Sequence, residues 1–361
     1  MRPSACAATV GARILVETRA DIARILAILL IAIGVGAAVG QAATGARVPV
    51  LAEPRPVPDG RVAHAARPAL AALTRSHPGR PSVQPHTAAR ATISLYERTD
   101  DPTVLRQQGC HAARRGVSGI VILDFGKPAW NGRTYGTILF SGRFAANASV
   151  TTAMLGYARG WVTCGGAGSG RIVLARGTSN YHINVPNAFH AGWMWAHETA
   201  ALDRRLAAAG LAAHVSAAAA DDVEPAWDRS FSRTFDFYRG FRGGSLGHLI
   251  YDFGSLDGGA GGVWTAQQAF YVSSGMRYAR AIPEIYTHAM ARQWAHLTRY
   301  ALERYHRPVR FAGLMTQHAG NPRNGFGPRE AHTALVRALV AHVGRLAPPV
   351  PRTLTDIRQP S

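Results

Sequence analysis

Strand-like and helix-like segments alternate along most of this chain, and this alternation limits its possible folds more than any other feature. GIVILDFG (119–126) is a short apolar run that ends in polar residues, as a buried parallel strand does. AFHAGWMWAHETAALDRRLAAAG (188–210) has the pattern of a long helix that stops at Gly210. Six strand-then-helix units are expected, with strands at 119–126, 171–180, 213–225, 248–257, 277–286 and 309–318. This order predicts a parallel sheet covered by helices.

Two more runs, ATISLYE (91–97) and YGTILFSG (135–142), could bring the number of strands to eight. Eight strands would close a (β/α)₈ TIM-like barrel, and the segment 91–347 has a typical barrel length. The barrel could be incomplete or irregular. An open doubly wound parallel sheet is the alternative, because counting units does not fix the topology.

The N-terminal segment has the features of an export signal. Basic residues precede the apolar run ILAILLIAIGVGAAVG (25–40), and the small-residue stretch QAATGA follows it. This order predicts that residues 1–43 are a secretory signal peptide or an uncleaved N-terminal membrane anchor, with residues 22–43 as a membrane tether. The protein is therefore expected to be secreted or otherwise extracytoplasmic.

The remaining chain divides by composition. Residues 44–90 are rich in Pro, Ala and Arg, so no periodic apolar face survives, and a flexible linker is expected. Residues 91–347 are predicted to form a single barrel domain. Residues 348–361 are again rich in proline at their start and are expected to be a flexible tail.

The net charge of +19 suggests an anionic partner, but the distribution of the basic residues does not suggest nucleic acid. Lys127 is the one lysine among 40 basic residues, and the arginines form no basic block and no regular pattern with aromatic residues. We expect no nucleic-acid partner. Adhesion of an exported basic protein to an anionic cell wall or lipid surface remains open.

The cysteines fit an oxidising compartment. Cys6 lies before the apolar run, which leaves Cys110 and Cys164 as an even pair. In a barrel, both would lie at the N-terminal ends of neighbouring strands, so a disulfide between them is expected. Two buried free thiols are the alternative.

Polar residues follow each of the six strands. Catalytic groups of parallel α/β folds lie at the carboxyl ends of strands, so these residues are candidates for a substrate site. Each could also be an ordinary cap or loop residue. The candidates are Asp124, Arg176, Asn180, His182, Asp221, Asp222, Glu224, Tyr251, Asp252, Glu284, Tyr286 and Gln317.

The acidic group after 213–220 is the most unusual of these. Side chains alternate along a strand, so Asp222 and Glu224 should point into the barrel mouth while Asp221 points away. Trp227 could form an apolar wall that disfavours the charged form of Glu224. Paired carboxyl groups beside aromatic residues are what hydrolysis of a glycosidic bond requires.

At these positions the chain resembles exported glycoside-hydrolase-like barrels, which include the Chalaropsis-type muramidases and a related bacterial domain of unknown function. Those muramidases have an Asp at the end of the first barrel strand and an Asp-x-Glu on a later strand. Asp124 and Asp222-Val223-Glu224 match this pattern. The resemblance implies that Glu224 is the general acid and that Asp222 or Asp124 is its partner.

Other motifs do not fit their structural context. GGSLG (243–247) matches the nucleophile elbow, but it follows a predicted helix and precedes a predicted strand. CGGAGSG (164–170) also precedes a strand, which is the wrong order for dinucleotide binding. The histidines form no metal motif, so neither a metal nor a cofactor is expected.

Three functions are compatible with this sequence. The first is an exported hydrolase of cell-wall glycan or polysaccharide that uses carboxyl groups as acid and base. The second is a barrel that binds glycan or cell wall without turnover. The third is a wall-associated scaffold. The fold alone does not choose among them.

Overall fold

The computed structural model describes residues 90–358, except 166, 167, 169, 257–262, 320–322 and 324. All of them belong to a compact unit, Pro81–Ser361. The expectations for residues 1–43 and 44–90 lie outside the described residues, apart from Arg90, which begins the first strand. Among the helices described, none combines the length and apolar character needed to span a membrane.

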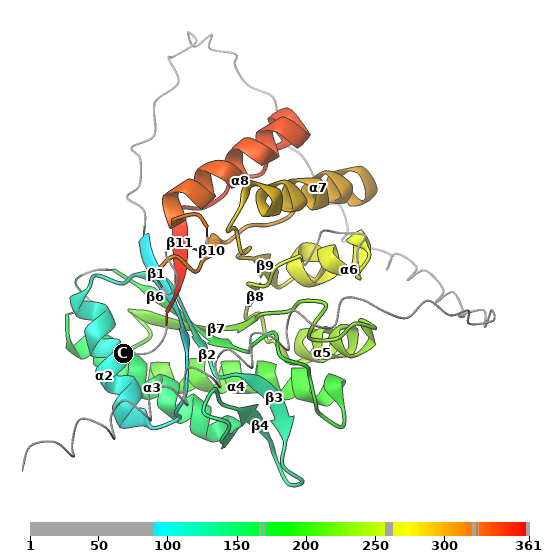
Figure 1. Ribbon diagram of the computed structural model, residues 1–361. Helices are drawn as coiled ribbons and strands as arrows, with labels where there is room; N and C mark the ends of the chain where they lie inside the picture. The colour runs from blue at the N-terminus through cyan, green and yellow to red at the C-terminus, as the bar shows by residue number, and fades with distance from the viewer. Residues whose placement is uncertain are drawn as a thin grey trace, which may run out of the picture. The chain divides into compact units, whose positions relative to one another are not determined.

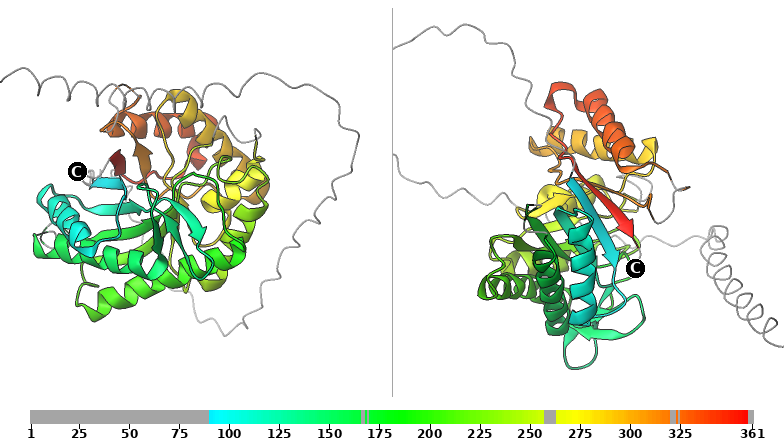
Figure 2. Two further views of the ribbon diagram at one scale, coloured as in Figure 1. Left: turned by 60° about the horizontal axis from the view of Figure 1, so that its bottom comes forward. Right: turned by 90° about the vertical axis from the view of Figure 1, so that its left-hand side faces the viewer.

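Eight parallel strands form an incomplete (β/α)₈ TIM barrel (Figures 1 and 2). Their order around the sheet is β10-β11-β1-β2-β6-β7-β8-β9. Two isolated parallel bridges, Ala281↔Phe311 and Glu284↔Met315, link the segments of β9 and β10 and nearly close the ring. The strands are β1 (Arg90–Tyr96), β2 (Gly119–Asp124), β6 (Ile172–Gly177), β7 (Val215–Asp221), β8 (Ile250–Asp252), β9 (Ala279–Ala281), β10 (Leu314–Thr316) and β11 (Thr353–Arg358).

A helix follows each barrel strand except β11 and packs on the outside of the barrel, as the left view of Figure 2 shows. Pro102 begins the first helix with Asp101 as its N-cap, which fits the preference of proline for the first helical turn. The helices are α2 (Pro102–Arg114), α3 (Asn147–Thr163), α4 (Ala188–Ala208), α5 (Ser232–Gly244), α6 (Ala266–Phe270), α7 (His288–Tyr305) and α8 (Pro328–Val343). A π-helical turn, Tyr271–Gly275, continues α6, and a 3₁₀ turn, Gly344–Leu346, continues α8.

The eighth barrel strand is β11, and this corrects two sequence-based expectations. The segment 348–361 is not wholly a flexible tail, because Thr353–Arg358 pairs with both β1 and β10. The right view of Figure 2 shows β11 in red beside β1 in cyan. The prolines before it suggested disorder, but TLTDIR itself contains the β-branched residues that favour strands.

The run 135–142 is not a barrel strand. Its strand part, β4 (Tyr135–Ile138), lies between β3 (Lys127–Trp130) and β5 (Phe144–Ala146) in a small antiparallel sheet. This sheet is inserted between β2 and α3, so it begins at the carboxyl end of the barrel. The sequence pattern of β4 could not distinguish a strand of this sheet from a barrel strand.

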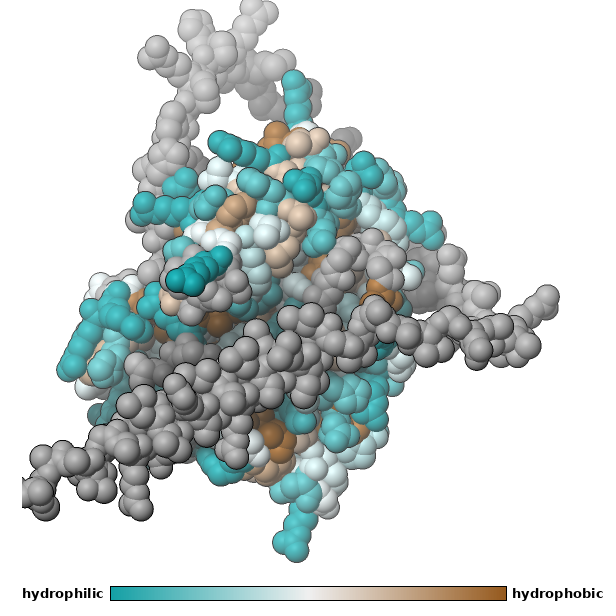
Figure 3. Space-filling view, in the orientation of Figure 1, coloured by the Kyte–Doolittle hydropathy of each residue, from teal (hydrophilic) through white to brown (hydrophobic). Residues whose placement is uncertain are grey.

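The barrel interior is filled by apolar side chains. Ala218 and Ala220 of β7 are fully buried there beside bulky neighbours, so the alanines of this strand allow close packing. The inner cluster is Ile120, Ile122, Ala175, Ala218, Ala220, Tyr251, Phe253, Ile282, Met315 and Ile357. Three further clusters lie between the strands and the helices. The face seen in Figure 3 is mostly hydrophilic over the described residues, with small scattered apolar patches.

Close helix contacts and one disulfide stabilise the first half of the barrel, which is formed by β1, β2, β6 and β7 and their helices. A Cβ on Gly240 of α5 would lie 1.9 Å from the carbonyl oxygen of Phe189 in α4, so only glycine allows this crossing. The predicted disulfide Cys110–Cys164 is present, with its Cα atoms 5.0 Å apart. It joins α2 to the C-cap of α3 and is compatible with an extracytoplasmic location.

Candidate functional site

Four carboxyl groups converge where the strands of the barrel end. Asp124 is the last residue of β2, Asp222 and Glu224 follow β7, and Glu284 follows β9. The pKa of Asp222 is raised well above its usual value, first by burial and then by the negative charges of Glu284, Glu224 and Asp124. We call this end of the barrel interior the mouth.

Tyr96 stands among these carboxyl groups. It is the last residue of β1, and its neighbour across the sheet is Asp124. Burial raises the pKa of the Tyr96 phenol, and Asp222, Asp124, Glu284 and Glu224 raise it further. The phenol therefore stays neutral at physiological pH and can donate a hydrogen bond in the mouth.

Asp124 and Asp222 are held in surroundings that favour their neutral forms. Asp124 is fully buried, and burial raises its pKa although its Oδ1 accepts a hydrogen bond of 2.8 Å from the Gly126 N–H. Asp222 is 4% exposed. Asp124 Oδ2 and Asp222 Oδ1 are buried without a hydrogen bond to any described residue. A protonated carboxyl group in such a place can give its proton to a substrate.

Glu224 has different surroundings. Its Oε2 accepts a hydrogen bond of 2.9 Å from Asn180 Nδ2, and its Oε1 accepts one of 2.9 Å from the Ser255 N–H. Gly254 permits the second bond, because a Cβ there would lie 2.8 Å from the Val223 carbonyl oxygen. Donors on both oxygens are the arrangement that stabilises an ionised carboxylate.

The far side of the mouth comes from the segments after β9 and β10. Glu284 is 6% exposed, and the pKa of the half-buried Tyr286 is raised by burial and then by Glu284. Gln317 follows β10 by one residue and is half-buried. Of the predicted site residues, Asp124, Asp222, Glu224, Glu284 and Tyr286 are therefore brought together, with Asn180 beside Glu224.

Exposed aromatic side chains lie next to these groups, and the sequence analysis did not identify them. Phe140, 37% exposed, packs on Tyr96 with ring centroids 4.6 Å apart. Tyr181 directly follows Asn180, is 65% exposed and carries the Lys127 ammonium 4.6 Å above its ring. Tyr96 was detectable, because it ends a predicted strand. Phe140 lies in the run 135–142, which was expected to be a barrel strand but ends in a turn here. Tyr181 lies in the loop after β6, where the sequence carries no signal of this kind.

Two predicted binding residues lie outside the mouth, and the structure corrects their assignment. Arg176 points from β6 towards the helices, where its guanidinium donates to Asn147 Oδ1 at 2.6 Å and lies 4.2 Å from the Trp195 ring. Trp227 is fully buried in the outer core, edge-on to Phe237 at 5.3 Å. It forms no wall of a substrate site. Both faces of a parallel strand are apolar, so the inner and outer faces could not be assigned from sequence.

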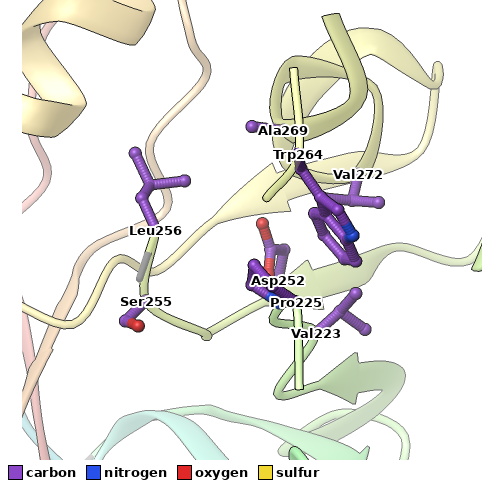
Figure 4. A pocket seen from close by; sticks show the side chains of 8 residues that line it. All are labelled: Val223, Pro225, Asp252, Ser255, Leu256, Trp264, Ala269 and Val272. Carbon is purple, nitrogen blue, oxygen red and sulfur yellow. The ribbon is translucent and has the colours of Figure 1, made fainter. Parts of the chain in front are cut away.

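Asp252 also points outward, because it is paired with Asp221 on the face opposite to Tyr251. It lines a small recess between the ends of β7 and β8 and helix α6. Figure 4 shows Asp252 beside Pro225, with Trp264 and Val272 on one side and Leu256 on the other. Burial raises the pKa of Asp252 well above its usual value.

Three other residues named in the sequence analysis, Asp221, Tyr251 and His182, do not join the carboxyl groups of the mouth. Asp221 points away from the mouth as expected, and its Oδ1 accepts a hydrogen bond of 2.8 Å from the Tyr238 hydroxyl of α5. Tyr251 belongs to the packed inner core, and burial raises its pKa to about 12. His182 is exposed in the loop after β6. No group of three or more His, Cys, Asp or Glu side chains in the described part of the chain is arranged to hold a metal ion.

Comparison with known proteins shows only distant similarity. No family model and no curated protein matches this sequence. One similar solved structure is the Rubisco-like protein from Rhodopseudomonas palustris, with 12% identity, a TM-score of 0.38 and coverage of 75% of this chain. This chain covers 60% of the length of that protein. Another is a GH5-4 broad specificity endoglucanase from an uncultured bacterium, with 10% identity, a TM-score of 0.33, and coverage of 72% of this chain and 77% of that one.

Proposed function

We propose that this protein is an exported glycoside-hydrolase-like enzyme that cleaves glycosidic bonds in cell-wall glycan or a related polysaccharide. The convergence of Asp124, Asp222, Glu224 and Glu284 in one barrel mouth carries this proposal. Hydrolysis of a glycosidic bond needs one carboxyl group that protonates the leaving oxygen and another that acts as base, nucleophile or charge stabiliser. The resemblance of Asp124 and Asp222-Val223-Glu224 to the muramidase pattern supports the same reading.

The surroundings of the two acids favour a division of roles opposite to the one the resemblance implies. Asp222 is buried beside three other carboxyl groups, which favours its protonated form and suits a general acid. Glu224 has a hydrogen-bond donor on each oxygen, which suits an ionised partner. Phe140 and Tyr181 would then stack on sugar rings, because their own rings are exposed.

Export is the second part of the proposal. The Cys110–Cys164 disulfide supports an oxidising compartment, and the apolar run 25–40 supports a signal peptide or membrane tether. A glycan partner outside the cell fits both observations. Expression with the native N-terminus, followed by assay of the extracellular fraction and the membrane fraction, tests this part separately.

The catalytic part is tested with Glu224→Gln, Asp222→Asn and the control Asp221→Asn. Isolated peptidoglycan and soluble polysaccharides are the substrates, and release of reducing ends is the measurement. We expect the first two variants to lose about 10²–10⁴-fold in rate, the usual contribution of acid–base assistance. Asp221→Asn should keep activity within about threefold, because this side chain faces Tyr238 outside the mouth. Equal losses in all three variants would contradict the assignment.

A barrel that binds glycan without turnover is the second candidate. The low exposure of the carboxyl groups favours it, since Asp124 is 0%, Asp222 4%, and Glu224 and Glu284 6% exposed. In this case the exposed rings would carry the binding. Tyr181→Ala would then weaken retention on insoluble glycan, and no substrate would be turned over by the wild-type protein.

A further inference from the structure

Two histidines on neighbouring helices face each other outside the barrel. His296 belongs to α7 and His342 to the last turn of α8, and their Nε2 atoms are 3.2 Å apart. The two rings meet nearly edge-on, with an interplanar angle of 77°. Helices α7 and α8 run beside each other at the outer side of the barrel (Figure 1), so the pair joins two helices and is separate from the mouth.

The ring of His342 is held in one tautomer. Its Nδ1 lies 2.8 Å from the carbonyl oxygen of Ala338. A carbonyl oxygen only accepts hydrogen bonds, so Nδ1 carries the proton and donates it. In the neutral ring, Nε2 therefore keeps its lone pair and accepts a hydrogen bond from the His296 Nε2–H. A ring nitrogen bonded to a backbone carbonyl, with the other nitrogen free to ligate, is the usual arrangement of a metal-binding histidine.

The separation of the two nitrogens fits a shared ion. Imidazole nitrogens bind Zn²⁺ at about 2.0–2.1 Å, so two of them on one ion lie about 2.9 Å apart at a right angle and about 3.3 Å apart at the tetrahedral angle. The observed Nε2–Nε2 distance of 3.2 Å lies between these values. An ion bound to both rings would replace the proton that His296 Nε2 shares with His342, and the two rings would turn so that both lone pairs meet at the ion.

Charged side chains of α7 lie near the pair. Arg292 and Arg299 face His296 and oppose the binding of a cation there. The positive charge of Arg299 is partly offset by Glu303, 3.6 Å away on the same helix.

We propose that His296 and His342 form a bis-histidine site for one divalent transition-metal ion of the Zn²⁺, Ni²⁺ or Cu²⁺ class, with water completing its coordination. Imidazole ligands select such ions over Mg²⁺ and Ca²⁺, which require oxygen ligands. The bound ion links α7 to α8 and so fastens the helices that precede β10 and β11. This role does not depend on the proposed hydrolase activity.

Hydrogen–deuterium exchange of the full chain, measured with and without ZnCl₂, tests this site. Zn²⁺ should slow exchange at least threefold in peptides from α7 and α8 of the wild type, and MgCl₂ should have no effect. His296→Gln and His342→Gln should each abolish the slowing. His332→Gln is the matched control, because it lies on α8 but its Nε2 already faces the Val350 carbonyl oxygen at 3.1 Å. It should respond to Zn²⁺ as the wild type does.

Calorimetric titration of the same proteins with Zn²⁺ gives a second readout that does not depend on local dynamics. One binding equivalent should weaken at least tenfold in His296→Gln and in His342→Gln, but not in His332→Gln. Histidines elsewhere in the chain contribute the same background to all four proteins. Unchanged titrations in the two site variants, or no slowing of exchange in the wild type with 1 mM Zn²⁺, would overturn the proposal.

Discussion

The two halves of the barrel are built differently. Strands β1, β2, β6 and β7 have six or seven residues each, whereas β8, β9 and β10 have three. The last strand, β11, has six residues and pairs regularly with β1, so the short strands are confined to β8, β9 and β10. The first half also has the disulfide and the closest helix crossings. In the second half, the bridges between β9 and β10 are isolated, and α6 has only five residues before the π-helical turn.

Proline explains part of this difference. Pro283 has no N–H to donate, so the regular pairing of β9 ends at Ala281. Its carbonyl oxygen still accepts the Met315 N–H at 2.9 Å, which keeps the two segments together. Three of the acids, Asp124, Asp222 and Glu224, thus come from the first half of the barrel. Glu284 and Tyr286 come from the short, irregular segments of the second half. We infer that the first half is the scaffold of the site and the second half its more adaptable wall.

The largest expected effect comes from removing the Cys110–Cys164 disulfide in the first half of the barrel. In the chain-entropy description, a cross-link over a sequence separation of 54 residues stabilises the folded state by about 4 kcal/mol. Cys110→Ser with Cys164→Ser should lower the free energy of unfolding by this order, measured by urea denaturation. Reductant should affect the wild type but not the variant. A loss below about 1 kcal/mol would show that the first half does not depend on this link.

A smaller effect is expected from one methyl group at the crossing of α4 and α5. Gly240→Ala would place a Cβ against the Phe189 carbonyl oxygen and should cost about 3 kcal/mol, because the two backbones must separate. Gly243→Ala is the matched control on the same helix, since a Cβ there meets nothing within 4 Å. It should stabilise the protein by about 0.5–1 kcal/mol through helix propensity. Similar thermal shifts for both variants would contradict the close crossing.

A pH dependence of stability is also expected, and it originates behind the mouth. Glu97 follows β1 and is fully buried, and burial raises its pKa to about 8 from an ordinary 4.5, although Gln108 donates to it. Between these two pH values the folded state holds a proton that the unfolded state has lost. Stability should therefore fall as pH rises from about 4.5 to 8, by about 1.4 kcal/mol per pH unit for this one group.

Glu97→Gln isolates this contribution. The variant should lose stability less steeply than the wild type when urea denaturation is compared at pH 5, 6, 7 and 8. The buried Asp222 acts in the same direction in both proteins. The difference between the two slopes therefore reports Glu97 together with its effect on Asp124, whose pKa the charge of Glu97 raises. Identical slopes would show that Glu97 is already ionised in the folded state.

Sequence patterns predicted the barrel and the end at which its acids collect, because both follow from the alternation of strands and helices. They also predicted the Cys110–Cys164 pair. They also predicted the direction of the acids after β7, because Asp221 points away from the mouth as expected. They did not predict which residues of β6 face inward, since the helices bury the outer face of each strand as fully as the core buries the inner one. Arg176 and Trp227 were misplaced for this reason. The eighth strand was missed because the prolines before it dominate the composition of the last residues.

The pairing of β11 with β1 has a consequence for how the domain is made. Among the described strands, β1 is the first to leave the ribosome, and its partner on one side, β11, is the last. One edge of β1 therefore stays without its native partner until residue 358 has emerged. Contacts between such distant parts of a chain form slowly. Completion of the ring must thus wait until nearly the whole domain has been translated.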